Sequence, residues 1–189
     1  MDGGRVTWSD MNRQVLYTID DLEMPKANRA GAQMRRHSSW QQFDVIQKNL
    51  TEENAEEYIS QYDIVVDCLN NFASRLILND TCVKLNKPFV HAGAEHLYGQ
   101  IMTVIPGESP CLRCLLPDGQ VPKDADSAAK ACIGATCAVI GGLQVMEVYK
   151  YILGLPCNTK GFFVFDGMEM AAQQLLISAN PQCSCRKKE

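Results

Sequence analysis

The chain has 189 residues, of which 46% are hydrophobic, and its formal net charge is −4. This length suits a single domain, residues 1–189, with a substantial core, and the acidic balance argues against a nucleic-acid-binding surface. Nine cysteines without a signal peptide after Met1 indicate a cytoplasmic protein whose thiols bind metal or pack in the core more than they form disulfides.

The N-terminal quarter is expected to hold short elements and one clear helix. Residues 2–6 are typical of the last residue of a strand followed by a turn, with the strand itself missing before Met1, and a polar loop follows at 9–14. Pro25 suits the first position of a helix over residues 26–37. Residues 43–50 alternate apolar and polar side chains, which predicts a strand. Thr51 can cap a helix over residues 52–61.

A strand and turn near the middle of the chain organise the rest. Residues 62–67 end an apolar run at Asp67, and a polar turn with Asn70 and Asn71 opens a helix over residues 72–86. An apolar run on both faces is typical of a buried parallel strand. Because ligands bind at the carboxyl ends of such strands, we expect Asp67, Asn70 and Asn71 to lie at a ligand-binding edge.

The second half alternates in the same way. Strands are expected at 88–92, 98–105, 161–166 and 170–177, with a polar loop at 117–130 and a helix at 133–153 that Gly154 ends. Gln144, Glu147 and Lys150 interrupt that helix, so it is expected to be a buried helix and not a membrane span. The alternation predicts an α/β fold with a doubly wound, mostly parallel sheet.

Two close cysteine pairs carry a metal-binding signal. Cys111 and Cys114 are spaced as half of a tetrahedral zinc site, and Cys183 with Cys185 could supply the other half. Buried thiols, or a redox pair at Cys111 and Cys114, are the alternatives. Five other cysteines show no partner by spacing: Cys68, Cys82, Cys132, Cys137 and Cys157. Core packing is expected for all of them except Cys157.

Two cations could hold a polyphosphate. Arg13 follows the polar loop and Lys26 starts a helix, and basic groups at the edge of a sheet can stabilise developing phosphate charge. On composition alone both side chains are more often solvated, so both interpretations stay open. We assign no role to His91 or His96.

Several collinear segments together resemble the ThiF/MoeB/HesA family, relatives of ubiquitin-activating enzymes. The resemblance extends over essentially the whole chain. It is carried by Ser-Asp-Met-Asn-Arg-Gln at 9–14, Pro-Lys-Ala at 25–27, Asp-Cys-Leu-Asn-Asn-Phe-Ala-Ser-Arg at 67–75, Gly-Glu-Ser-Pro-Cys-Leu-Arg-Cys at 107–114 and Ile-Gly-Gly-Leu-Gln at 140–144.

The resemblance implies a Rossmann-like fold and an adenylyltransferase. Such a protein uses ATP and Mg²⁺ to activate the C-terminal glycine carboxylate of a small ubiquitin-like carrier ending in Gly-Gly, typically a sulfur carrier, and works as a homodimer or with a homologous subunit. It implies catalytic roles for Arg13, Lys26 and Asn70. By the resemblance, Asp2 would hold the ribose, and the phosphates would be held by Ser9, Asn12, Arg13 and Lys26. The magnesium would be faced by Asn70 and Asn71. A structural zinc would be bound by Cys111, Cys114, Cys183 and Cys185.

Four departures from the family pattern keep alternatives open. The family's first strand and Gly-rich loop are not in the sequence, so the chain as given is expected to be incomplete for ATP binding. Asn70 stands where the family has aspartate, Asp10 where it has asparagine, and Ser127 where many members have a sulfur-transferring cysteine. The alternative functions are a non-catalytic member that binds a ubiquitin-like protein or an active partner subunit, and a zinc-stabilised paralogue without a partner.

Overall fold

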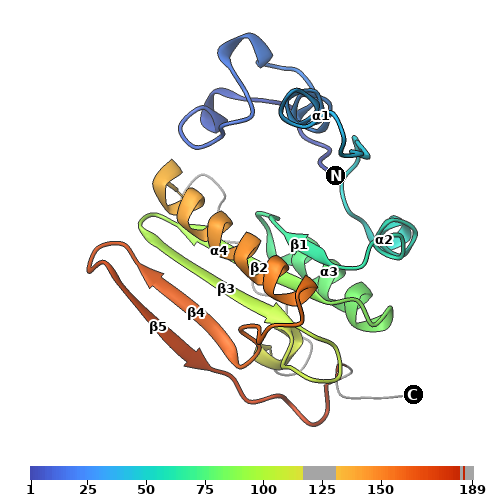
Figure 1. Cartoon of the computed structure of the whole chain (residues 1–189), viewed down its shortest axis with the longest axis vertical. Helices are drawn as coiled ribbons and strands as arrows, with labels where there is room; N and C mark the ends of the chain where they lie inside the picture. Colours follow the sequence, from blue (N-terminus) through green and yellow to red (C-terminus); the bar gives the residue numbers. More distant parts are fainter. Residues whose placement is uncertain (117–130, 184, 186–189) are drawn as a thin grey trace. The chain divides into compact units, whose positions relative to one another are not determined.

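The computed structural model of the chain describes residues 1–116, 131–183 and 185. The chain divides into two compact units, Met1–Leu50 and Thr51–Glu189, which are described separately (Figure 1). The expected polar loop at 117–130, with Ser127, lies outside the described residues. Across the part of the chain that is described, none of the helices combines the length and hydropathy needed to cross a bilayer.

The first unit is built from two short 3-10 helices and one α-helix. The 3-10 helices are η1 (Trp8–Asp10) and η2 (Ile19–Asp21), and α1 (Lys26–His37) has the predicted bounds. The strand predicted at 43–50 is wrong. That segment makes a backbone hydrogen bond from Asp2 N to Ile46 O (3.1 Å) but is part of no strand ladder, and alternation without a neighbouring strand does not form a sheet.

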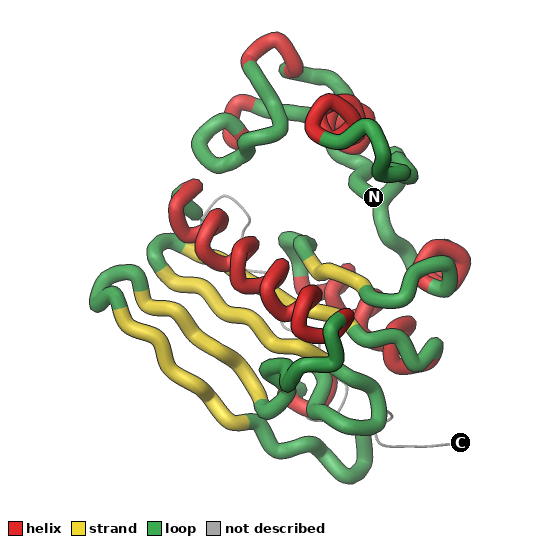
Figure 2. The backbone as a smooth tube through the Cα atoms, in the orientation of Figure 1, coloured by secondary structure: helices red, strands yellow, loops and turns green. Residues whose placement is uncertain are grey.

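The second unit contains a five-stranded sheet and its helices, which Figure 2 shows as yellow and red segments. The strand order is β1-β2-β3-β4-β5. In chain order the elements are α2 (Glu52–Ile59), β1 (Val65–Asp67), α3 (Phe72–Lys84), β2 (Phe89–Glu95), β3 (Tyr98–Val104), the 3-10 helix η3 (Leu112–Leu115), α4 (Gly134–Ile152), β4 (Gly161–Asp166) and β5 (Ala171–Leu176).

The sheet is mixed, which corrects the prediction of a mostly parallel one. Only β1 and β2 pair in parallel, whereas β2–β3, β3–β4 and β4–β5 are antiparallel. Short connections explain two of these antiparallel pairs, because β2 and β3 are joined by His96 and Leu97 alone and β4 and β5 by residues 167–170. A parallel pair needs a crossover of a dozen or more residues, so such short connections can only make hairpins.

Helix α4 packs on one face of the sheet, over β2 and β3 (Figure 1). Ala92, Ile101 and Ile140 form the buried cluster at this contact. Gly99 permits the close approach, since a Cβ at that position would lie 2.2 Å from the side chain of Ile140. Any larger residue at position 99 would therefore force the side chain of Ile140 to move and disturb this packing.

Two buried polar side chains of α4 are fully engaged. Glu147 accepts hydrogen bonds from Thr103 Oγ1 on β3 (2.5 Å) and from the backbone N of Asn158 (2.6 Å), and it also pairs with Lys150. Gln144 donates to backbone carbonyls of β1 and β2, as described below. These contacts fix α4 against the sheet, because leaving such groups buried and unpaired would be strongly unfavourable.

Candidate functional site

The turn that follows β1 is built on a buried carboxylate. Asp67 is fully buried, and its Oδ2 lies 2.6 Å from Nδ1 of His91, which is also buried. Its Oδ1 accepts a hydrogen bond from the backbone N of Leu69 (2.9 Å). Asp67 therefore shapes the turn, and a ligand in solvent does not reach its side chain.

Two further side chains hold this turn from neighbouring elements. Arg75 on α3 donates from Nε to the carbonyl of Leu69 (3.1 Å), and its guanidinium lies 3.8 Å from Asp67 Oδ2. The Nε2 of Gln144 on α4 donates to both the carbonyl of Asp67 (3.0 Å) and the carbonyl of Val90 (3.1 Å). The backbone from Asp67 to Leu69 is thus fixed by groups on α3, β2 and α4.

The two asparagines of the turn differ in what they offer a ligand. Asn71 caps α3, because its Oδ1 accepts from Ser74 N (2.8 Å), and its Nδ2 donates to Asn70 Oδ1 (3.3 Å). Asn70 is exposed. Asn70 is therefore the one of the two asparagines that the turn presents to solvent, with an uncharged amide oxygen as its acceptor.

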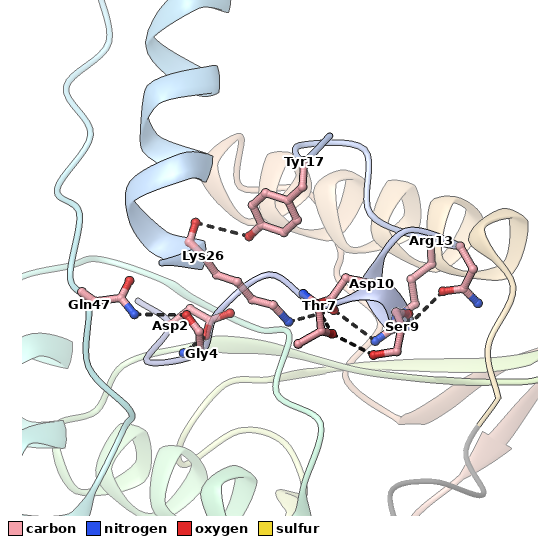
Figure 3. A network of polar contacts seen from close by, with 10 residues as sticks. Asp2, Gly4, Thr7, Ser9, Asp10, Arg13, Tyr17, Lys26 and Gln47 are labelled. Atoms are coloured by element: carbon pink, nitrogen blue, oxygen red, sulfur yellow. Dashed lines mark hydrogen bonds and ion pairs between the residues drawn. The ribbon is translucent and has the colours of Figure 1, made fainter. Parts of the chain in front are cut away.

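In the first unit a buried carboxylate gathers the two predicted cations (Figure 3). Asp10 Oδ1 lies 2.8 Å from Lys26 Nζ and 3.5 Å from the guanidinium of Arg13. Its Oδ2 accepts from the backbone N and the hydroxyl of Thr7, both at 2.9 Å. Lys26 and Arg13 keep 19% and 32% of their side-chain surface exposed, so both cations remain accessible beside their counter-ion.

The protonation of Asp10 follows from these contacts. Burial by itself raises the pKa of this carboxyl, but the hydrogen bond from Lys26 and those from Thr7 outweigh it and hold the pKa below its ordinary value of 3.8. Asp10 is consequently ionised at neutral pH and offsets the charge of Lys26. The resemblance described above implies an uncharged asparagine at this position.

The other predicted binding residues of the first unit are exposed. Asp2 Oδ1 accepts from Gly4 N (2.7 Å), and the carbonyl of Gly4 in turn accepts from Gln47 Nε2 (3.1 Å). Ser9 lies on η1, and Arg13 donates to Asn12 Oδ1 (3.0 Å) (Figure 3). Ser9, Asn12 and Arg13 thus lie within three residues of Asp10 along the chain, and Lys26 reaches Asp10 from the start of α1.

The structure brings the four predicted cysteines together. The Sγ atoms of Cys111, Cys114, Cys183 and Cys185 lie within 4.8 Å of one another. Cys111 and Cys183 are 3.6 Å apart, and Cys114 and Cys185 are 3.5 Å apart. In a tetrahedral zinc site with Zn–S bonds of about 2.3 Å, sulfur atoms are separated by roughly 3.8 Å, so the cluster has the right size for one ion.

The electrostatics of the cluster also fit a cation. Burial, with the neighbouring thiols Cys114 and Cys183, raises the pKa of Cys111 to about 12, and burial and Cys111 likewise raise the pKa of Cys185. Four thiols cannot all ionise so close together unless a positive charge compensates them. The donor set therefore matches a thiolate-bound metal such as zinc.

Sequence reasoning missed the residues that hold the site. Asp10 was noted only as a departure, and His91, Arg75 and Gln144 were given no role. Gln144 had a usable signal, because an amide inside an apolar helix must find a hydrogen-bond partner. Cys82 and Cys132 are buried as expected, whereas Cys68 is exposed, which corrects its assignment to the core.

Comparisons with known proteins identify the family. The model of the ThiF family matches residues 1–186. The chain is 35% identical over 186 residues to the sulfur carrier protein adenylyltransferase of Thermus thermophilus, covering 95% of this chain and 69% of the relative. It is 31% identical over 183 residues to the sulfur carrier protein ThiS adenylyltransferase of Escherichia coli, covering 96% of this chain and 72% of the relative.

A solved structure has the same fold. The crystal structure of E. coli MccB with MccA-N7isoASN superposes with a TM-score of 0.84 at 20% identity, and the match covers 98% of this chain. This chain spans 58% of the length of that MccB chain. From the collinear motifs, the mixed sheet and these matches, we conclude that the chain belongs to the ThiF family.

Proposed function

We propose that the protein activates the C-terminal glycine carboxylate of a small ubiquitin-like carrier by adenylation. The observation that carries the proposal is the similarity, along almost the whole chain, to two sulfur carrier protein adenylyltransferases. In such a reaction the carboxylate attacks the α-phosphate of ATP and pyrophosphate leaves. Positioning and charge neutralisation supply most of the rate enhancement.

The first unit would supply the positive charge. Lys26 and Arg13 converge on the carboxylate of Asp10, so the unit already holds two cations around one anionic group. We propose that they also contact the phosphates, with Ser9 and Asn12 donating from their side chains and Asp2 accepting from the ribose hydroxyls. The positive charge would stabilise the negative charge that builds up on the phosphates in the transition state.

The turn after β1 would orient the magnesium-bound phosphates. Asn70 is exposed and is held in place through Asn71, whose side chain caps α3. Amide oxygens are accepted ligands of Mg²⁺, although they contribute no charge. We propose that Asn70 and Asn71 face the ion, which when bound neutralises phosphate charge.

Further properties implied by the family stay proposals. We propose a structural zinc at Cys111, Cys114, Cys183 and Cys185, supported by the size and electrostatics of that cluster. The match of one family model across residues 1–186 supports the interpretation of both units as one domain. We also propose a cytoplasmic homodimer, or pairing with a homologous subunit.

The test is carrier-dependent ATP–pyrophosphate exchange by the natural protein expressed from its own gene. Purified carriers ending in Gly-Gly are supplied one at a time, with a carrier lacking the last glycine as control. We expect exchange with at least one carrier, and a decrease of about 10²-fold or more for Arg13→Ala, which removes a transition-state cation. Arg36→Ala, on the same helix as Lys26 but remote from Asp10, should retain the exchange.

One set of observations favours a non-catalytic binding protein as a second candidate. Asp10 already neutralises Lys26, and Asn70 offers an amide where the family has a carboxylate. A carrier that binds tightly without any exchange would support this second candidate and refute the first. Absence of both binding and exchange with every Gly-Gly carrier would refute the first candidate and would leave, of the second, only binding to an active partner subunit.

A further inference from the structure

Two cysteines at the start of α4 lie in contact outside the four-cysteine cluster. The Sγ atoms of Cys132 and Cys137 are 3.3 Å apart. Cys132 is buried, and Cys137, in the first turn of α4, is partly exposed. A disulfide bond is about 2.05 Å long, so these sulfurs need to approach by little more than 1 Å to be bonded.

The backbone holds the two thiols in this arrangement. Residues 131–137 are tied to His96 twice, because His96 N donates to the carbonyl of Ala131 (2.6 Å) and the hydroxyl of Thr136 donates to the carbonyl of His96 (2.9 Å). The amide of Cys137 also donates to the carbonyl of Ile133, the residue that precedes α4 (3.2 Å). The backbone on both sides of the sulfur contact is thus held by hydrogen bonds.

The pair is unsuited to holding a metal by itself. Tetrahedral zinc requires four donors, or three with one open position. Of the side chains that the structure describes, only the four-cysteine cluster brings three or more metal-binding groups together. Two adjacent thiols are instead the arrangement that a two-electron oxidant converts to a disulfide.

We propose that Cys132 and Cys137 form a reversible disulfide on exposure to a hydroperoxide. The more exposed sulfur, that of Cys137, attacks one oxygen of hydrogen peroxide as thiolate and becomes a sulfenic acid, and hydroxide leaves. The Cys132 sulfur then attacks that sulfur, the S–S bond forms and water leaves. Two thiols and one peroxide thereby give one disulfide and two waters.

The modification would cross-link the segment before α4 to the first turn of the helix. A small thiol reductant restores both thiols by exchange through a mixed disulfide. The site is independent of the proposed adenylation, because it requires neither nucleotide nor carrier. Its chemistry also differs from that of the four-cysteine cluster, whose sulfurs are suited to a metal.

Trypsin provides a direct test on the wild-type protein. Cleavage after Lys130 and Lys150 releases peptide 131–150, whose only cysteines are Cys132 and Cys137. The folded protein is treated with hydrogen peroxide, alkylated, digested without reductant and analysed by mass spectrometry. We expect this peptide to be lighter than the reduced form by two hydrogens and to carry no alkyl group. After treatment with dithiothreitol before alkylation, the same peptide should carry two alkyl groups.

Matched variants and a denatured control sharpen the result. Cys157→Ser should leave the disulfide unchanged, whereas Cys137→Ser should leave Cys132 open to alkylation after unfolding. When the wild-type protein is unfolded before oxidation, the Cys132–Cys137 disulfide should no longer predominate over disulfides that join either cysteine to another one. A peptide 131–150 that remains doubly alkylated, that accumulates sulfinic acid without a disulfide, or that joins another cysteine peptide in the folded protein would overturn the proposal.

Discussion

At the scale of single residues, Asp10 shows how the first unit differs from the family pattern. Its carboxylate is 2% exposed and faces Lys26 and Arg13, the two cations that we propose for phosphate binding. A phosphate that enters this site must therefore compete with an internal anion. An asparagine at the same position would keep one acceptor for the cations without a competing charge.

Replacing Asp10 is expected to decrease the stability of the protein and to increase its affinity for ATP. Asp10→Asn should lower the free energy of unfolding by about 1–3 kcal/mol, because a buried ionic partner of Lys26 is lost. It should also tighten ATP binding, since Lys26 and Arg13 no longer have an anionic competitor. Chemical denaturation and ATP titration measure the two effects. Asp20→Asn, at an exposed position on η2, is the control, and weaker ATP binding by the Asp10 variant would contradict the competition.

At the scale of elements, α4 depends on a buried carboxylate near its end. Burial by itself raises the pKa of Glu147, but hydrogen bonds from Lys150, Thr103 and the backbone of Asn158 together lower it by more. The pKa therefore lies below its ordinary value of 4.5. A group whose pKa is depressed in the folded state stabilises it above the ordinary pKa. That stabilisation is lost as the pH falls through the folded-state value.

Glu147 therefore predicts a pH-dependent stability difference. Glu147→Gln should lower the free energy of unfolding at pH 7 by about 1–3 kcal/mol, because an amide replaces an ionised acceptor of buried donors. The difference from the wild type should shrink as the pH falls below 4.5, where the wild-type carboxyl begins to protonate in the unfolded state. Urea denaturation between pH 7 and pH 3 measures it. A difference in the free energy of unfolding between the variant and the wild type that stays constant over this pH range would count against an ionised Glu147.

The elements also show what periodicity predicts well. The bounds of α1 and β4 were predicted to the residue, because Pro25 fixes the start of one and a short apolar run defines the other. The direction of the strands was missed, since apolar content does not distinguish a parallel from an antiparallel strand. The available signal was the short connection, residues 93–97, between the strands predicted at 88–92 and 98–105, because a parallel pair needs a longer crossover.

At the scale of the whole molecule, the four-cysteine cluster joins sites far apart in the chain. It connects the segment around η3 to residues 183 and 185, more than 70 positions later. Spacing predicted this set of four, because each pair is close in sequence and the donor chemistry requires four partners. The residues that fix the turn after β1 could not be paired in advance, since His91 and Gln144 reach Asp67 only through the fold.

The metal proposal is tested by metal analysis. The purified protein should contain about one zinc per chain, and Cys111→Ser should retain almost none, because three thiolates with a hydroxyl form a much weaker site. The melting temperature of the variant should fall, since metal-binding energy contributes to folding stability. Cys157→Ser, a partly exposed thiol outside the cluster, is the control. Equal zinc content in the Cys111 variant and the wild type would remove the case for the site.

The amide of Gln144 has a geometric consequence for α4 as a whole. One nitrogen donates to carbonyls on two adjacent strands, so turning the helix about its own axis by a single residue, about 100°, would break both bonds together. Gln144 therefore helps to set the rotation of α4, together with Glu147 and the packing of Ile140. That setting also determines the direction in which Met146, Tyr149 and Ile152 face solvent, and any partner of that apolar stripe would meet it in one orientation only.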